Sequence, residues 1–254
     1  MSRMEGKAAI VNGATSGMGR ATALLFAREG ASVLASGRDL NRGRLLVDEI
    51  RAAGGRAEFV PGDAAVPETA DVLVEACRRA FGGVDSVVCC AGMLGLGSIT
   101  NVPVETWKQT LAVNLDSVFY LLRGALPAIA ARGGGSAIVI GSIAAFKGFP
   151  NHAAYCASKG ALVALVRQAA IDYGPTIRIN LVCPGPVDTP FIWASASAFP
   201  NPSDAVAEAG RKTVLRRLGS ADDVARAALF LACDESAWVT GTSLTVDGGA
   251  TTGG

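Results

Sequence analysis

The sequence predicts a single doubly wound α/β domain, in which a parallel sheet of about seven strands is covered by helices on both faces. The main observation is that short runs, apolar throughout, alternate with longer amphipathic stretches along the 254 residues. Strands buried on both faces have this continuous apolar character, and parallel strands need helical crossovers between them. The length suits one large α/β domain, and no internal repeat or linker divides residues 1–254.

The individual elements follow from this alternation. The apolar runs predict strands at 8–12, 32–36, 56–61, 86–90, 136–140, 177–183 and 243–246. The stretches between them predict helices at 18–29, 40–53, 67–81, 103–131, 155–173 and 221–233. The one irregular stretch is rich in proline, serine and aromatic residues, and it predicts a loop with short helices, long enough to form a lid near 190–212.

Composition narrows the class of protein further. Half of the residues are hydrophobic and only 18% are charged, which is apolar enough to suggest surface buried between subunits. We therefore expect a homodimer or homotetramer. The formal net charge of +1, with scattered Lys and Arg residues, indicates neither a nucleic-acid partner nor a membrane partner.

The six cysteines show no CxxC pair and no metal-ligand spacing with the single histidine, His152. Free thiols in a reducing compartment are the simplest interpretation, so we expect no metal site. No apolar run resembles a signal peptide or reaches the ~18 to 20 residues of a membrane span. These observations predict a cytoplasmic protein.

A glycine-rich turn, 12–19, joins the first predicted strand to the first predicted helix. Glycines at Gly13, Gly17 and Gly19 let the chain turn tightly and bring backbone N–H groups close to a pyrophosphate, which a helix N-terminus favours. Many strand-helix junctions need glycine for geometry alone. The position of the turn after the first strand of an alternating chain favours dinucleotide binding.

About 20 residues further on, at the end of the second strand, such folds distinguish NAD from NADP. An acid there accepts hydrogen bonds from the ribose hydroxyls, whereas an arginine pairs with a 2′-phosphate. This chain has both, as Arg38 and Asp39. Arg38 comes first after the strand, so we expect NADP. If Arg38 is only a solvated loop residue, the cofactor is NAD.

Tyr155 and Lys159 are four residues apart on a predicted helix and therefore share a face. A free tyrosine has a pKa of about 10, and a neighbouring ammonium lowers that pKa towards the range useful for proton transfer. The pair alone is also typical of a core aromatic beside a solvated amine. It gains meaning from the motifs around it.

Those motifs recur in order along the chain. Besides the glycine turn and the Tyr-Lys pair, they are Asp63 after the third strand, Asn114, Ser142 thirteen residues before Tyr155, the run 184–189, the run 217–219 and the run 246–249. With them the chain resembles the short-chain dehydrogenase/reductase family, in its single-domain branch of about 250 residues. The resemblance implies a Rossmann-type sheet and an NAD(P)-dependent oxidoreductase that interconverts a secondary alcohol and a ketone.

The resemblance also implies catalytic roles. Tyr155 exchanges the proton of the reacting oxygen, and Lys159 lowers the pKa of Tyr155 and holds the nicotinamide ribose. Ser142 hydrogen-bonds the reacting oxygen, unless it only satisfies local backbone. Asn114 binds a water in a proton relay towards Lys159, and a buried asparagine bonded only to backbone is its alternative.

The family pattern likewise assigns the cofactor contacts, with Asp63 at the adenine and Thr189 at the carboxamide. The residues expected to bind NADP, or NAD as the alternative, are Gly13, Thr15, Ser16, Gly17, Met18, Gly19, Arg38, Asp63, Ala64, Cys90, Ala91, Gly92, Tyr155, Lys159, Pro184, Gly185, Val187 and Thr189. Cys89 and Cys90 depart from the family's Asn-Asn and are expected to pack as small apolar groups, with a redox switch as the alternative.

Apolar residues are expected around the substrate, which favours a hydrophobic ketone or secondary alcohol over a sugar. The expected substrate contacts are Ser142, Ala144, Phe149, Tyr155 and Trp193, within a wider apolar set that also includes Leu94, Leu96, Pro186, Phe191, Ile192 and Phe199. The lid aromatics could instead only pack the closed loop. The alternative substrate class is that of a 3-oxoacyl-[acyl-carrier-protein] reductase, and a non-catalytic nucleotide-binding regulator is a third possibility.

Overall fold

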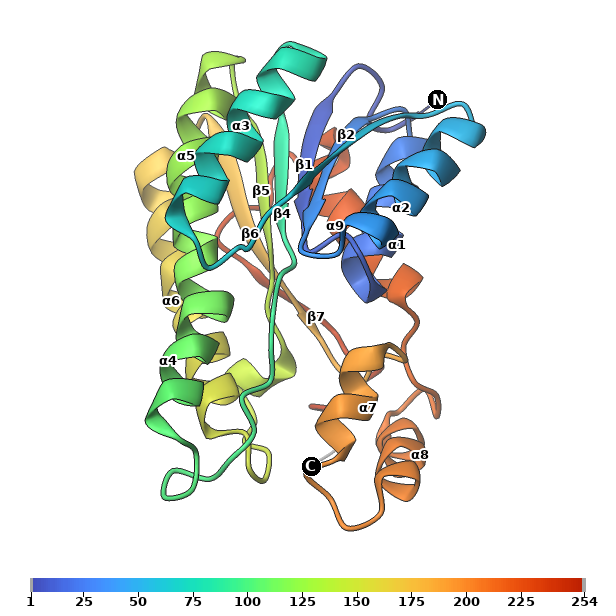
Figure 1. Ribbon diagram of the computed structural model, residues 1–254, viewed down its shortest axis with the longest axis vertical. Helices are drawn as coiled ribbons and strands as arrows, with labels where there is room; N and C mark the ends of the chain where they lie inside the picture. The colour runs from blue at the N-terminus through green and yellow to red at the C-terminus, as the bar shows by residue number, and fades with distance from the viewer. Residues whose placement is uncertain (1, 253–254) are drawn as a thin grey trace.

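The computed structural model describes residues 2–252 (Figure 1). A seven-stranded sheet forms the middle layer of the molecule. The strand order is β3-β2-β1-β4-β5-β6-β7, and every pair of neighbours is parallel. This confirms the predicted parallel sheet. The strands are β1 (Ala8–Asn12), β2 (Ser32–Gly37), β3 (Arg56–Pro61), β4 (Ser86–Cys89), β5 (Gly135–Ile140), β6 (Ile177–Pro184) and β7 (Ser243–Val246).

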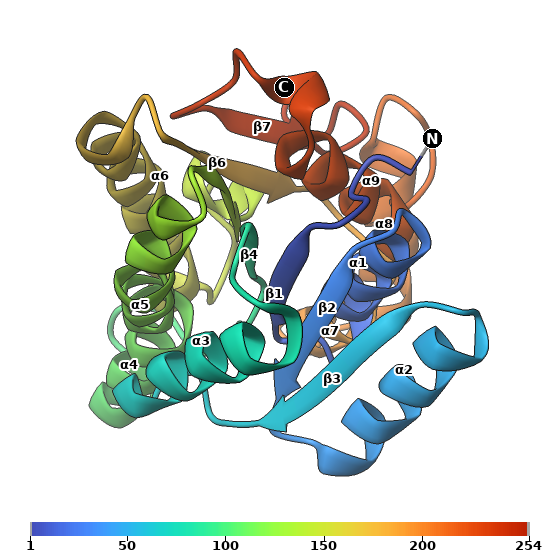
Figure 2. The ribbon, with the colours of Figure 1, turned by 90° about the horizontal axis from the view of Figure 1, so that it is seen from above.

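Helices cover both faces of the sheet, as Figure 2 shows from above. One apolar cluster joins the sheet to α1 (Gly17–Arg28), α2 (Leu40–Ala52) and α9 (Ala221–Ala232). A second cluster joins the other face to α3 (Pro67–Phe81), α5 (Ser117–Ala131) and α6 (Ala153–Tyr173). Residues of β1, β2 and β4 are buried along the whole length of each strand, which explains why these strands are not alternating in sequence.

The topology determines where a ligand can bind. From β1 the chain moves outward through β2 to β3, and it then returns to the other side of β1 to form β4. The crossovers on the two sides of this point diverge, and they leave a crevice at the carboxyl ends of the strands. The lid segment, residues 190–212, follows β6 at the same end and contains α7 (Pro190–Ala196) and α8 (Pro202–Lys212) (Figure 1).

The helix predicted over 103–131 is present but is not a uniform α-helix. It consists of α4 (Val104–Leu111), a π-helical turn (Ala112–Asp116) and α5. A π turn accommodates one extra residue, so it rotates the face of α5 relative to that of α4. Asn114 lies in the middle of this turn and is fully buried. Among the described residues, no helix is both long and apolar enough to cross a bilayer.

Candidate functional site

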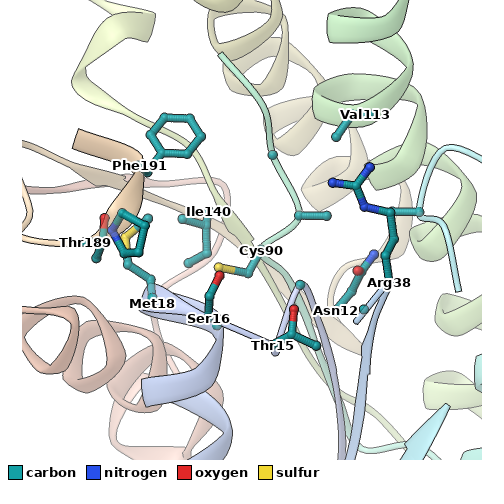
Figure 3. A pocket seen from close by; sticks show the side chains of 18 of the residues that line it. Asn12, Thr15, Ser16, Met18, Arg38, Cys90, Val113, Ile140, Thr189 and Phe191 are labelled. Atoms are coloured by element: carbon teal, nitrogen blue, oxygen red, sulfur yellow. The ribbon is translucent and has the colours of Figure 1, made fainter. Parts of the chain in front are cut away.

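A cavity of about 380 Å³ opens at the carboxyl ends of the strands, next to the switch in strand order (Figure 3). It is formed by the segments after β1 to β5, by α6 and by α7. Its lining residues are Asn12, Gly13, Thr15, Ser16, Gly17, Met18, Gly19, Gly37, Arg38, Gly62, Asp63, Ala64, Cys90, Ala91, Gly92, Val113, Ile140, Gly141, Tyr155, Lys159, Thr189, Pro190, Phe191 and Ala194.

Most of the residues predicted to bind a cofactor lie on this surface, although they are widely separated in sequence. Arg38 lies at one end of the view in Figure 3, and Thr189 and Phe191 lie at the other. The predicted residues brought together here are Gly13, Thr15, Ser16, Gly17, Met18, Gly19, Arg38, Asp63, Ala64, Cys90, Ala91, Gly92, Tyr155, Lys159 and Thr189.

The glycine turn leaves the N-terminus of α1 open towards the cavity. Ser16 is the N-cap residue, and its side chain accepts no capping hydrogen bond. The first N–H groups of a helix have no partner within the helix, and the helix dipole favours an anion beside them. Gly13 has φ of +74°, and a Cβ on it would lie 2.6 Å from the backbone nitrogen of Ala91. The turn therefore fits a pyrophosphate group that needs close approach to the backbone.

Replacing Gly13 by alanine is expected to lower the free energy of unfolding by about 2 to 4 kcal/mol and to weaken cofactor binding, because the new Cβ strains φ and overlaps the backbone after β4. Gly54 is the matched control, since it has φ of +83° and open space around its Cβ position. Gly54→Ala is expected to cost about 1 kcal/mol, from φ alone. Urea denaturation of both variants measures the difference, and equal losses would show that the overlap at Gly13 is absent.

The two charged residues after β2 have different environments. Asp39 is the N-cap of α2: it accepts a hydrogen bond from the backbone N–H of Arg42 at 3.0 Å and pairs with the Arg42 guanidinium at 2.9 Å. Arg38 lines the cavity and is exposed, and among residues 2–252 its guanidinium has no hydrogen-bond or ion-pair partner. Within the described residues the arginine therefore has no competing partner, whereas the aspartate already holds Arg42.

Tyr155 and Lys159 are both buried in α6 and line the cavity. The Lys159 Nζ donates a hydrogen bond to the Ile140 carbonyl at 2.9 Å and lies 5.8 Å from the centroid of the Tyr155 ring. Burial raises the pKa of Tyr155 to about 12, although a hydrogen bond with Ser142 acts in the opposite direction. The expectation that Lys159 lowers this pKa stays a prediction.

Burial shifts the pKa of Lys159 in the opposite direction. It lowers the pKa of Lys159 to about 8, because the charged form loses its hydration. The sequence placed the two groups on one face of a helix, but it contained no information about the depth of that face or about Ile140. Both pKa values follow from that depth.

Ser142 and Asn114 flank this pair without lining the cavity. The Ser142 hydroxyl accepts a hydrogen bond from the N–H of Ala144 at 3.1 Å. The Asn114 amide exchanges two hydrogen bonds with the backbone of Met93, at 2.8 and 2.9 Å, and donates a third to the Ser158 hydroxyl at 2.9 Å. Asn114 is therefore not bonded to backbone alone, and it ties the loop after β4 to α6.

Three residues predicted to contact the cofactor lie outside the cavity lining. Pro184 is buried at the end of β6, where it pairs with Val246 of β7. Gly185 packs against Asp247, and Val187 belongs to the apolar cluster shared with α9. The backbone after β6 pairs with two later segments, since the Gly185 N–H donates to the Val246 carbonyl at 3.0 Å and Val187 forms a bridge with Gly219.

The predicted substrate contacts lie only partly on this cavity, and their roles stay predictions. Trp193 is 49% exposed, and its indole N–H donates to Asp188 at 3.3 Å. Phe191, from the wider apolar set, lines the cavity, with its ring 5.7 Å from that of Tyr155. Residues two apart on a helix face different directions, which explains why Phe191 lines the cavity and Trp193 does not. Ala144 and Phe149 lie outside the lining too.

Several lining residues were not predicted as contacts. They adjoin predicted motif residues, so adjacency was the available signal, and they are Asn12, Gly37, Gly62, Val113, Ile140, Gly141, Pro190 and Ala194.

Cys89, the last residue of β4, and Cys90, which follows it, are poorly suited to redox chemistry. Burial raises the pKa of Cys89 to about 12 and that of Cys90 to about 11. Since the thiolate is the reactive form, both groups are unreactive near neutral pH. This supports the interpretation of the pair as small apolar groups.

Comparison with known proteins identifies the family of the chain. The family described as "Enoyl-(Acyl carrier protein) reductase" matches residues 13–251. The cyclohexanol dehydrogenase of Acinetobacter sp. (strain SE19) is 36% identical, over 98% of this chain and 96% of its own, and the dehydrogenase/reductase SDR family member 6 of Danio rerio is 34% identical, over 98% and 99%. The ligand-free aldohexose dehydrogenase of Thermoplasma acidophilum superimposes with a TM-score of 0.89 at 30% identity, over 99% and 96% of the two chains. The chain belongs to the short-chain dehydrogenase/reductase family of oxidoreductases.

Proposed function

We propose that this protein uses NADP to interconvert a hydrophobic, preferably alicyclic, secondary alcohol and the corresponding ketone. The observation that carries the proposal is that Tyr155 and Lys159 are buried side by side on one helix, at a cavity that also contains the open glycine turn. When bound, a nicotinamide supplies the hydride exchange. The glycine turn, Arg38 and Thr189 are the proposed residues that hold it.

The proposed proton chemistry belongs to Tyr155. In reduction its neutral phenol donates a proton to the carbonyl oxygen, and in oxidation its phenolate accepts the proton of the alcohol. Ser142 would hydrogen-bond the same oxygen, since it already influences the Tyr155 hydroxyl. Lys159 supplies the positive charge that favours the phenolate once the site is filled. Asn114 acts on α6 through Ser158, which keeps the helix in register with the loop after β4.

The state of the two charged residues after β2 supports NADP over NAD. A ribose diol needs a free acceptor, and the Asp39 carboxylate is already engaged at the N-terminus of α2. A 2′-phosphate needs a free cation, which Arg38 provides.

Arg38→Ala is expected to raise the KM for NADP by about 10- to 100-fold, as the loss of a charge-assisted hydrogen bond predicts, and to change the KM for NAD by less than about 3-fold. Arg44→Ala is the control, because Arg44 is an exposed arginine of α2 that does not line the cavity. Steady-state kinetics with each cofactor gives both values. A strong wild-type preference for NAD that Arg38→Ala leaves unchanged would contradict the NADP proposal.

The substrate class is inferred from the surface near Tyr155. Ile140, Phe191 and Ala194 give that part of the cavity an apolar character. Apolar contacts favour an alicyclic ring over a polyhydroxylated sugar. One relative is named for cyclohexanol, and the structural neighbour is named for an aldohexose. These two names correspond to two substrate classes, an alicyclic alcohol and a sugar.

A substrate panel tests the proposed function. It contains cyclohexanol, cyclohexanone, an aldohexose and a 3-oxoacyl thioester, each assayed with NADP and NAD by the absorbance of the reduced cofactor. We expect the cyclic pair to give the highest kcat/KM. Highest activity on the thioester would favour a 3-oxoacyl-[acyl-carrier-protein] reductase, and cofactor binding without any turnover would favour the regulator.

We also propose a homodimer or homotetramer. Large apolar side chains remain exposed, among them Phe119 on α5 and Ile171 on α6. Such exposure is typical of surfaces that are covered in an assembly. Multi-angle light scattering at micromolar concentration tests this, and a monomer would refute it.

A reducing, cytoplasmic compartment is the corresponding proposal for location, supported by six cysteines that are all free. Fractionation of the source cells would test it.

A further inference from the structure

His152, the sole histidine of the chain, connects the start of α6 with the lid segment. Its side chain is buried, with the residue only 3% exposed. The Nδ1 atom lies 2.6 Å from the Pro150 carbonyl oxygen, and the Nε2 atom lies 2.8 Å from the Ser195 hydroxyl of α7. Both ring nitrogens are therefore engaged, one within its own loop and one across to the lid segment.

These partners determine the tautomer of the neutral ring. A carbonyl oxygen only accepts, so Nδ1 carries hydrogen, and in the neutral ring Nε2 accepts from the Ser195 hydroxyl. If the ring gains a second proton, Nε2–H donates to Ser195 Oγ instead, because a hydroxyl both donates and accepts. The connection to α7 persists in either state, and neither nitrogen is left to exchange protons with a substrate.

The lid segment has few other polar attachments. Its remaining hydrogen bonds, such as those from the Ile192 N–H to Thr189 and from Trp193 to Asp188, stay within the segment or reach its immediate flanks. In the described part of the chain, the contact between His152 and Ser195 is the one hydrogen bond that joins residues 190–212 to a residue outside 188–217.

The same side of α7 also packs against Tyr155. Phe191 and Ser195 are four residues apart and share a helix face. The Phe191 ring lies 5.7 Å from that of Tyr155, and the His152 ring lies 6.1 Å from Tyr155 and 6.1 Å from Phe149. The hydrogen bond between Ser195 and His152 therefore also holds Phe191 against Tyr155.

We propose that His152 is a positioning residue that anchors α7 through Ser195, and that this anchor keeps Phe191 over Tyr155 and so sets the affinity for the substrate. The effect on affinity rests on the function proposed above, but the anchoring of the lid segment does not. A neutral hydrogen bond contributes about 0.5 to 1.5 kcal/mol. Its loss therefore raises the equilibrium constant for opening of the lid segment by about 2- to 10-fold.

Hydrogen-deuterium exchange measures the anchor without any activity. In Ser195→Ala, amides of residues 190–200 are expected to exchange about 2- to 10-fold faster than in the wild type, while amides of the sheet are unchanged. Ser195→Thr retains a hydroxyl and is expected to restore wild-type exchange. Ser197→Ala is the matched control, because the Ser197 hydroxyl donates only to Ala194 in its own segment. Equal exchange in the wild type and in Ser195→Ala would overturn the proposal.

A double-mutant cycle tests whether His152 is the partner. His152→Phe keeps an aromatic ring, and adding Ser195→Ala to it is expected to speed exchange no further. Additive effects would show that Ser195 acts through another group.

Kinetics then test the effect on the substrate. With the best alcohol from the panel, Ser195→Ala is expected to raise KM by about 2- to 10-fold with kcat nearly unchanged. Faster exchange without a KM change would refute the role in affinity and leave the anchor standing. Failure of the panel itself would refute only the proposed function.

Discussion

Tyr155→Phe is expected to lower kcat by about 10²- to 10⁴-fold in both reaction directions, while cofactor binding changes little. The substitution removes one oxygen atom, and with it the only proposed route for the proton of the reacting oxygen. The ring, which contacts His152 and Phe191, remains in place. The loss should therefore lie in kcat and not in KM, as for an interaction that matters chiefly in the transition state.

Stopped-flow or steady-state assays measure kcat, and cofactor fluorescence measures binding. Tyr173→Phe is the matched control, because Tyr173 ends the same helix and is 41% exposed. Full turnover in Tyr155→Phe would disprove the acid-base assignment. The assignment also implies that oxidation accelerates as pH rises, since burial raises the pKa of Tyr155 to about 12 and the phenolate is the base.

The sequence predicted the sheet well because the apolar pattern that identifies each strand lies within a few consecutive residues. Runs such as 8–12 and 86–89 are apolar on both faces, and only strands covered on two sides combine that character with helical crossovers. The glycine turn was also readable, since Gly13 has a positive φ, which glycine adopts without strain. Requirements of this kind act within a few residues and are visible in a single chain.

The remaining features depend on contacts between distant segments. Apolar spacing cannot distinguish an α-helix from a π turn, so the turn around Asn114 was not predicted; this asparagine bonds Met93 and Ser158, far away in sequence. Which of the two expected lid aromatics, Phe191 or Trp193, lines the cavity depends on how α7 is rotated, and no local pattern specifies that rotation. The pKa values depend on burial, which is a property of the whole fold.

Lys159→Met is expected to stabilise the protein while it lowers kcat/KM by about 10²-fold or more, because buried charges at functional sites are retained at a cost in stability. Burial lowers the pKa of Lys159 from its usual 10.5 to about 8. Since one pKa unit corresponds to about 1.4 kcal/mol, the buried ammonium destabilises the fold by about 3 kcal/mol at neutral pH. Methionine removes that charge but leaves the Ile140 carbonyl without its donor, so a net gain of about 1 to 3 kcal/mol remains.

The pH dependence of this gain separates the electrostatic explanation from a packing effect. Between pH 8 and 10.5 the unfolded chain binds a proton at Lys159 that the folded protein has released, so wild-type stability rises with pH in this window. The advantage of Lys159→Met should therefore be greatest below pH 8 and disappear above pH 10.5. Urea denaturation at several pH values measures it, with Lys108→Met at an exposed lysine of α4 as the control. An advantage that is the same at pH 7 and above pH 10.5 would come from packing, and a loss of stability at pH 7 would mean that the charge is compensated within the fold.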